Sequence, residues 1–322
     1  MKRVLLTGIS GFIGSHLLAH ILARTDWEIV GLDRLDEAAS LAKLGKFCGP
    51  RFRFVWHDLR ATVRPEAIGC DALRGDFDYV VHLAAGSHVD RSVKDPLGFV
   101  ADNVNGTGHL LEFVRCHTPG ARVIAFGTDE VFGPAPPGTT FRPWDRHNPA
   151  NPYAATKSAA DSLAVAYAHT YGLRIITTRC GNVFGPGQHP EKFIPIAVDS
   201  IRTGKTIPIH AVNGIPCSRL YLYVENAADA IRHILLHGTE IDGTETNGRY
   251  NITGLDEYSN LEVIDRIGEL LCKPPKWQLV ENPPGRLRPD LRYSISGDEL
   301  EAIGWKPTVS FEEGLRRTVL GA

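Results

Sequence analysis

Short apolar runs alternate with segments of helical periodicity throughout the first half of the chain. The apolar runs predict strands at residues 3–7, 28–33, 52–58, 79–85, 122–128 and 174–180. The intervening segments predict helices at residues 12–23, 65–73, 96–115 and 151–171. Continuously apolar strands that alternate with helices are typical of a parallel sheet covered on both faces. The first half therefore predicts an α/β fold with a doubly wound parallel Rossmann sheet.

The pattern changes at about residue 185, where prolines and glycines begin to separate short elements. A further apolar run at 219–224 precedes another helix, and we expect this strand to rejoin the main sheet. The sequence thus predicts a cofactor-binding domain at 1–184, completed by about 219–238, and a smaller mixed α/β substrate-binding domain at 185–322. Ligands of open α/β sheets bind at the carboxyl ends of the strands, so we expect the second domain to cover that edge.

Composition excludes several classes of partner. The 322 residues carry a formal net charge of −2, which gives no electrostatic reason to expect nucleic acid or an anionic membrane. The chain has no apolar run of about 18 residues and no recognisable signal peptide, which favours a cytoplasmic protein. Its six cysteines are scattered without a CxxC pair, and its thirteen histidines lack ligand spacing, so no metal site is expected.

A glycine-rich turn predicts a dinucleotide cofactor. Gly8, Gly11 and Gly14 follow the first strand and open the first helix, where glycines let a pyrophosphate approach backbone N–H groups. Taken alone, the same glycines also suit a plain strand–helix turn. Asp33 ends the second strand, where a carboxylate binds both ribose hydroxyls and repels a 2′-phosphate, so NAD is favoured; Arg34 beside it leaves slight room for NADP. The other residues expected along the cofactor are Phe12, Ile13, Asp58, Leu59, Leu83, Ala84 and Ala85.

Candidate acid–base chemistry follows the fifth strand. Asp129 and Glu130 end that strand, and two neighbouring carboxyl groups resist simultaneous ionisation, so one suits an acid and the other a base. Tyr153 and Lys157 lie four residues apart and share one helix face, where a fixed cation lowers a phenol pKa. Each pair alone also fits a solvated turn or an ordinary helix face. Their position at one sheet edge, beside the glycine turn, favours a catalytic role.

These residues together resemble the extended short-chain dehydrogenase/reductase superfamily and, within it, the dTDP-glucose 4,6-dehydratases. The narrower resemblance is carried by residues 82–92, 103–112, 128–133, 179–195, 219–225, 250–254, 288–293 and 304–315. Its most discriminating element is Asp129–Glu130 after Thr128. The chain departs from the family at Gly86, where Glu is usual, at Phe132, where Tyr is usual, and around Arg286. The last departure leaves the nucleotide base open.

The resemblance implies NAD, a nucleoside-diphosphate sugar substrate and specific roles. Tyr153 takes the sugar O4 proton, Lys157 lowers the tyrosine pKa and holds the nicotinamide ribose, and Thr128 binds near O4. Glu130 removes the C5 proton, and Asp129 protonates the departing C6 hydroxyl. The implied product is a 4-keto-6-deoxy sugar nucleotide.

Substrate contacts and an oligomeric state are also implied by resemblance. Arg219 and Arg286 are the candidates for the pyrophosphate, because a guanidinium bridges two phosphate oxygens. The remaining substrate-binding candidates are Ser87, Asn182, Lys192, Phe193, Pro208, His210, Asn251 and Tyr293. A homodimer is expected through the helices at 96–115 and 151–171.

Three alternatives stay open at this point. An epimerase or decarboxylase would share the C4 oxidation, although a 4-epimerase needs no acid at C6. A dehydratase acting on another sugar nucleotide or ring bond would use the same carboxylates. A non-catalytic NAD-sensing protein would share the fold, although such proteins tend to lose the tyrosine or lysine, both present here.

Overall fold

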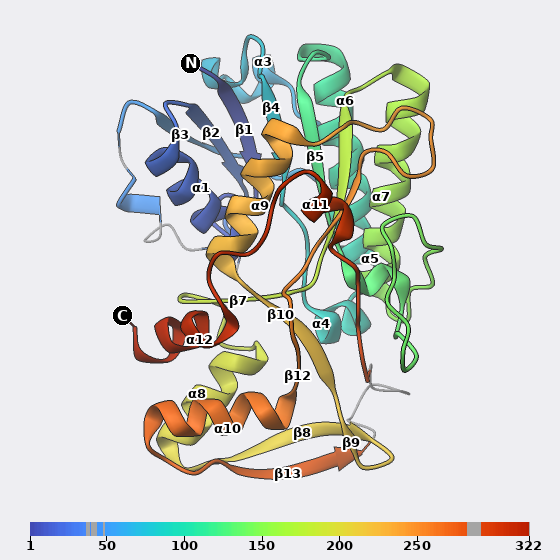
Figure 1. Ribbon diagram of the computed structural model, residues 1–322. Helices are drawn as coiled ribbons and strands as arrows, with labels where there is room; N and C mark the ends of the chain where they lie inside the picture. Colours follow the sequence, from blue (N-terminus) through green and yellow to red (C-terminus); the bar gives the residue numbers. More distant parts are fainter. Residues whose placement is uncertain (37–38, 40–43, 48, 282–290, 322) are drawn as a thin grey trace.

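The computed structural model describes residues 1–36, 39, 44–47, 49–281 and 291–321, and its largest element is a seven-stranded sheet (Figure 1). The strand order is β11-β6-β5-β4-β1-β2-β3, and all pairings are parallel. The strands are β1 (Arg3–Thr7), β2 (Glu28–Asp33), β3 (Phe52–Trp56), β4 (Tyr79–His82), β5 (Arg122–Thr128), β6 (Ile175–Cys180) and β11 (Arg249–Ile252). The doubly wound α/β prediction is confirmed. Strands β3 and β4 end earlier than predicted, because the chain leaves the sheet at its carboxyl edge.

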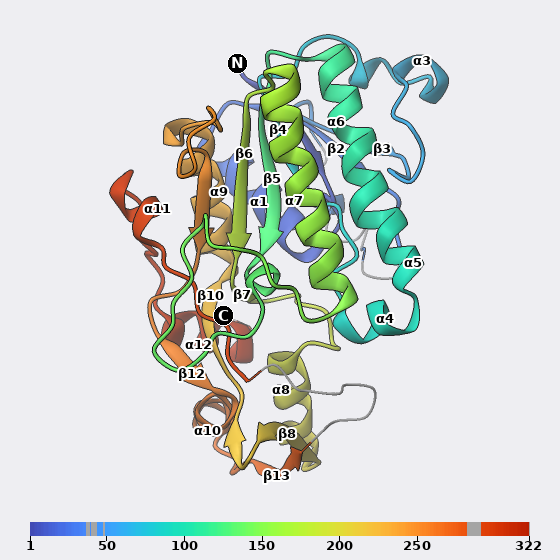
Figure 2. The ribbon, with the colours of Figure 1, turned by 90° about the vertical axis from the view of Figure 1, so that its right-hand side faces the viewer.

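Helices cover both faces of this sheet. Helices α1 (Phe12–Arg24) and α9 (Val224–His237) pack together on one face. Helices α6 (Gly106–His117) and α7 (Pro152–Tyr171) cover the other, as Figure 2 shows. Alternate residues of a strand point to opposite faces. In β1, accordingly, Val4 and Leu6 join the core under α1 and α9, whereas Leu5 joins the core under α6 and α7.

Two predicted helices are interrupted. Residues 96–115 form α5 (Pro96–Phe99), a π turn η2 (Val100–Asn105) and then α6. Residues 65–73 form α3 (Pro65–Ile68) and a 3₁₀ turn η1 (Asp71–Leu73), because Gly69 ends the first helix with a left-handed φ of 65°. A short helix α4 (Val89–Lys94) was not predicted.

The prediction that strand 219–224 rejoins the main sheet is wrong. Strand β10 (Ser218–Tyr223) pairs with β7 (Asn182–Phe184) and β12 (Glu257–Ser259) in a separate sheet. The free edge of β6 is instead occupied by β11. The segment at 219–238 therefore adds helix α9 to the main sheet but no strand.

The rest of the second half forms a smaller unit beyond the carboxyl edge of the main sheet (Figure 1). Its third sheet has the order β13-β8-β9. The remaining elements of this unit are β8 (Thr206–Val212), β9 (Ile215–Pro216), β13 (Lys276–Glu281), α8 (Phe193–Thr203), α10 (Asn260–Leu271) and α12 (Phe311–Leu320). Phe184, Tyr223 and Phe311 lie at the centre of its own apolar core. Helix α11 (Asp298–Ala302) packs instead against β11 of the main sheet. Among the described helices, none has the length and apolarity that a membrane span requires.

Candidate active site

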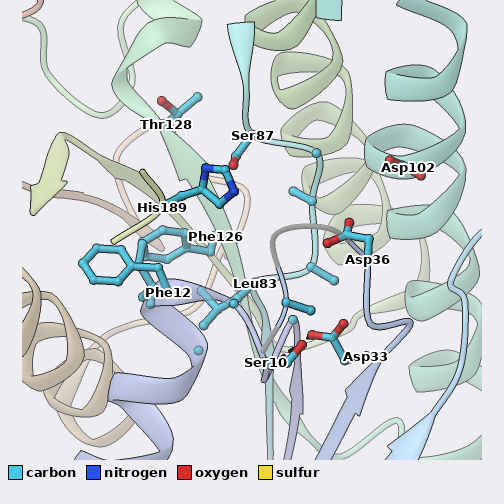
Figure 3. Close-up of a pocket in the computed structure, with 18 of the residues that line it drawn as sticks. Ser10, Phe12, Asp33, Asp36, Leu83, Ser87, Asp102, Phe126, Thr128 and His189 are labelled. Carbon is cyan, nitrogen blue, oxygen red and sulfur yellow. Dashed lines mark hydrogen bonds between the residues drawn. The ribbon is translucent and has the colours of Figure 1, made fainter. Parts of the chain in front are cut away.

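A cavity of about 640 Å³ opens at the carboxyl ends of the central strands, and both halves of the chain line it (Figure 3). The predicted site residues in its wall are Gly8, Gly11, Phe12, Ile13, Gly14, Asp33, Arg34, Asp58, Leu59, Leu83, Ala84, Ala85, Ser87, Thr128, Asp129, Glu130, Tyr153, Lys157, Asn182 and Lys192. The structure therefore brings all the predicted cofactor and catalytic residues to one cleft.

The glycine turn at one end of the cleft leaves no room for side chains. Gly8 has a φ of 69°, and a Cβ on it would lie 2.7 Å from the backbone nitrogen of Ala84. A Cβ on Gly14 would lie 2.1 Å from the Gly8 carbonyl oxygen. Helix α1 begins at Gly11 without a side-chain cap, so its first N–H groups are open to an anion. This cradle fits a dinucleotide pyrophosphate.

The end of β2 holds a fixed carboxylate. Asp33 accepts hydrogen bonds from the backbone N–H of Ser10 at 3.0 Å and of Leu35 at 2.8 Å. The guanidinium of Arg34 is bound to Asp102 and Asp36. Asp33 thus lies where the ribose of a bound dinucleotide is expected.

The two catalytic carboxyl candidates follow β5 directly, in a 3₁₀ turn η3 (Asp129–Phe132). Thr128 donates its hydroxyl to Asp129 Oδ1 at 3.2 Å and accepts from the Glu130 N–H at 3.4 Å. Asp129 is only 5% exposed. Burial, and then the charge of Glu130, raise its pKa to about 7. The neighbouring carboxyl group thus acts in the direction expected from the sequence, but burial of Asp129 has the larger effect.

The Tyr153–Lys157 pair lies in the cleft, but its electrostatics differ from the prediction. Burial and the nearby Glu130 raise the pKa of the Tyr153 phenol, against a hydrogen bond with Thr128 that lowers it. Lys157 donates its ammonium to the carbonyl oxygen of Phe126 at 2.6 Å, and burial lowers its pKa to about 8. The pKa of the tyrosine is therefore raised and not lowered as predicted, because burial is the largest effect on the phenol.

Sequence reasoning missed two residues that support these groups. Asn151 donates its amide to Glu130 Oε2 at 3.0 Å and accepts from the Ala154 N–H at 2.8 Å. Its position just before Pro152 is a helix N-cap signal that could have revealed it. Asn103 binds the backbone N–H and C=O of Gly86 at 2.8 and 3.1 Å. The π turn that orients Asn103 has no sequence signal that we can identify.

The predicted substrate contacts divide into two groups. Ser87, Asn182 and Lys192 lie in the cleft, where the Lys192 ammonium donates to the Ser87 carbonyl oxygen at 3.3 Å. Arg219 is not part of the cleft wall. Its positive charge nevertheless lowers the pKa of Asp129 and so offsets part of the increase caused by burial. Its guanidinium lies 4.8 Å from the ring of Tyr293.

The other substrate candidates are not gathered with these. Asn251 is fully buried and lines a second cavity of about 360 Å³, where it donates to the Phe141 carbonyl oxygen at 3.1 Å. The candidates outside the cleft wall on α8 and β8 are Phe193, Pro208 and His210. Arg286 lies outside the described residues.

Comparison with known proteins identifies relatives that are described as sugar-nucleotide 4,6-dehydratases. Residues 5–318 match the family described as GDP-mannose 4,6 dehydratase. The dTDP-glucose 4,6-dehydratase of Escherichia coli is 34% identical, over 98% of this chain and 91% of that protein. A trifunctional UDP-glucose 4,6-dehydratase/epimerase/reductase of Arabidopsis thaliana is 35% identical over 99% of this chain, which spans about half (46%) of that protein.

Solved structures agree in fold along the whole chain. DesIV, a dTDP-glucose 4,6-dehydratase from Streptomyces venezuelae solved with NAD and TYD bound, has a TM-score of 0.86 and 35% identity, over 99% of this chain and 96% of that one. A UDP-glucose 4-epimerase from Thermus thermophilus, solved with NAD, has a TM-score of 0.85 and 30% identity, over 99% and 98% of the two chains.

Proposed function

Because the chain belongs to the GDP-mannose 4,6-dehydratase family, we propose that it is an NAD-dependent sugar-nucleotide 4,6-dehydratase, a hydro-lyase of the dTDP-glucose or UDP-glucose type. The observation that carries this proposal is one cleft that holds Asp129 and Glu130 together with Tyr153 and Lys157. An oxidising site alone needs the tyrosine and lysine. Elimination of water needs a further acid and base, and the adjacent carboxyl groups supply them. The product is a 4-keto-6-deoxy sugar nucleotide.

The cofactor assignment is supported by the fit of the cradle at the end of β1. The glycine turn and the uncapped start of α1 suit the pyrophosphate, and Asp33 suits the adenosine ribose. When bound, NAD supplies a hydride acceptor at C4 and later a hydride donor at C6, together with the positive charge of its oxidised ring. Lys157 is assigned to the nicotinamide ribose.

Tyr153 is the proton acceptor for the sugar O4 hydroxyl. In the free protein its raised pKa keeps the phenol protonated. A positive charge beside a phenol lowers its pKa, so an oxidised nicotinamide ring would favour ionisation of Tyr153. Thr128, which acts on the phenol through a hydrogen bond, is assigned to the sugar O4.

Glu130 and Asp129 divide the elimination between them. A ketone at C4 acidifies the C5 proton, which Glu130 removes. Asp129, with a pKa of about 7, is substantially protonated near neutral pH and protonates the departing C6 hydroxyl. Burial raises the pKa of the acid, while the hydrogen bond from Asn151 favours the ionised form of the base.

The test is mass spectrometry of the purified protein incubated with dTDP-glucose, UDP-glucose, UDP-N-acetylglucosamine and GDP-mannose. Loss of one water from one substrate, with no net reduced cofactor, is the expected result and identifies the base and hexose. Inversion of a sugar without loss of water would favour a 4-epimerase. Binding of NAD without turnover of any substrate would favour a non-catalytic protein.

The proposal also assigns the cofactor to one half of the chain and the substrate to the other. We assign the cofactor to residues 1–184 with α9 and β11, and the sugar nucleotide to the rest of residues 185–322, where the charge of Arg219 acts on Asp129. The cytoplasmic location that we expect from the sequence stays a prediction.

A homodimer is also proposed, formed by an apolar surface on α4, α5 and η2. Val93, Leu97 and Val100 are 43%, 79% and 39% exposed there, beside helix α7. Covering such side chains with a second copy stabilises them. Light scattering should give twice the chain mass, and Leu97→Glu should give a monomer; a monomeric wild-type protein would refute the dimer.

A further inference from the structure

Arg34 follows Asp33 at the end of β2, where the adenosine ribose of a dinucleotide is expected. An arginine at this place is the usual partner of the 2′-phosphate that distinguishes NADP from NAD. In this structure its guanidinium already has carboxylate partners. Both terminal nitrogens bind Asp102, Nη2 at 2.8 Å from Oδ2, and Nη2 also lies 3.0 Å from Asp36 Oδ2.

The backbone around Arg34 is fixed as well. The indole of Trp56 donates to the Arg34 carbonyl oxygen at 3.0 Å. Leu35 has a left-handed φ of 60°, and its N–H donates to Asp33 Oδ1 at 2.8 Å. A non-glycine residue with positive φ persists only where its surroundings hold it. This turn therefore presents the arginine side chain towards η2 rather than leaving it free to reorient.

Asp102 belongs to the π turn η2, which also lines the cleft beside the end of β2. Its side chain is only 14% exposed. Figure 3 shows Asp33, Asp36 and Asp102 along the same side of the cavity. A fork of two parallel hydrogen bonds between a guanidinium and a carboxylate is among the stronger contacts in proteins, the more so when it is partly shielded from water. Arg34 would have to break it in order to bind a phosphate.

We propose that Asp102 is a specificity-determining residue that makes this protein prefer NAD to NADP. It holds Arg34 in a carboxylate pair and so denies a 2′-phosphate its cationic partner, in addition to the repulsion by Asp33. A 2′-phosphate would also meet the carboxylates of Asp36 and Asp58 at the same end of the cleft, where Asp58 engages Arg60, the second guanidinium in the cleft wall. The inference rests on the proposed function only in taking the cofactor to be a nicotinamide dinucleotide.

The experiment measures dissociation constants of NAD and NADP by calorimetry, after exchange of any copurifying nucleotide. In Asp102→Asn the two-bond pair is lost and Arg34 keeps only its contacts with Asp36 and Asp58. We expect NADP to bind about tenfold more tightly while NAD changes less than about threefold. Asp36→Asn is the matched control, because it removes the more exposed carboxylate and leaves the fork intact. In Asp36→Asn, the ratio of the NAD and NADP dissociation constants should change little.

The double variant Arg34→Ala with Asp102→Asn separates a phosphate contact from a general loss of negative charge. If Asp102 acts through Arg34, the gain for NADP disappears in the double variant; if the gain persists, the inference is overturned. Arg34→Ala alone provides a second test should Asp102→Asn fold poorly. It should leave NADP affinity nearly unchanged, and a large loss would show that Arg34 already binds the phosphate.

These outcomes also distinguish the inference from the proposed function. NAD binding with an unchanged NAD-to-NADP ratio in Asp102→Asn would overturn the inference alone. A failure to dehydrate any sugar nucleotide would overturn the proposed activity while leaving the measured ratios valid. Binding of neither dinucleotide to the wild-type protein would overturn both.

Discussion

Asn151 joins the start of helix α7 to the carboxylate of Glu130 through one side-chain amide. Its oxygen accepts from the Ala154 N–H at 2.8 Å, and its nitrogen donates to Glu130 Oε2 at 3.0 Å. Because the helix cap fixes the oxygen, the nitrogen is directed at the glutamate. Tyr153 lies two residues further along the same helix. One residue thus sets the position of Glu130, the proposed C5 base, relative to Tyr153, the proposed O4 base.

Replacing Asn151 should impair the base without unfolding the helix. In Asn151→Asp the side chain still caps α7, but a carboxylate faces Glu130 and raises the glutamate pKa. We expect the turnover number to fall about tenfold or more, with the pH optimum shifted upward. The direct measurement is exchange of the substrate C5 proton with deuterated water. Exchange should slow in step with turnover.

Asn151→Ser is the matched control, because serine also caps helices and adds no charge. It should retain the wild-type melting temperature and lose only the contact to Glu130. NAD affinity should stay within about twofold of wild type in both variants. If Asn151→Asp exchanged the C5 proton at the wild-type rate, Asn151 would have no positioning role.

Asp129→Asn tests the division of the elimination. The amide cannot protonate the departing hydroxyl, so turnover should fall about 10²-fold or more while oxidation at C4 still occurs. Stopped-flow absorbance should then show reduced nicotinamide accumulating after mixing with substrate. Glu130→Gln is the comparison, since it blocks the earlier C5 step. An Asp129→Asn enzyme that lost water at the normal rate would rule out Asp129 as the acid.

Much of the fold was predictable because buried parallel strands have a simple sequence pattern. Strands such as β1 and β5 are apolar along their length since helices cover both faces. The partner of β10 was not predictable in this way. An apolar run shows that a strand is buried but not which edge it pairs with, and here β11 occupies the edge of β6. The π turn η2 likewise has no composition of its own.

The candidate site was likewise predictable only in part. Spacing placed Tyr153 and Lys157 on one helix face, and the structure has both in the cleft wall. Spacing could not give the direction of the tyrosine pKa, because that depends mainly on how deeply the phenol is buried. Asn251 was predicted from its position in a motif, but that position does not show which cavity a side chain lines, and Asn251 lines the second one.

The raised pKa of Asp129 should also appear in stability. A carboxyl group whose pKa rises from 3.8 in the unfolded chain to about 7 in the folded one takes up a proton on folding. Its contribution therefore becomes less favourable as the pH rises through that window. We expect Asp129→Asn to raise the melting temperature at about pH 8 and to change it little at about pH 4. Calorimetric scans at both pH values check this, and an equal shift at both would contradict it.

Gly14 should tolerate no side chain, whereas Gly108 should accept one. A Cβ on Gly14 would lie 2.1 Å from the Gly8 carbonyl oxygen, so Gly14→Ala must displace the turn that forms the pyrophosphate cradle. We expect a loss of roughly 2 kcal/mol or more in the free energy of unfolding, together with loss of NAD binding. Gly108 lies in helix α6, where an added Cβ meets nothing within 4 Å. Gly108→Ala should therefore stabilise the protein by about 0.5–1 kcal/mol and leave NAD affinity unchanged. Denaturant unfolding measures the stability, and calorimetric titration measures the NAD affinity. Equal effects of the two substitutions would show that the turn does not depend on the close approach of Gly14 to Gly8.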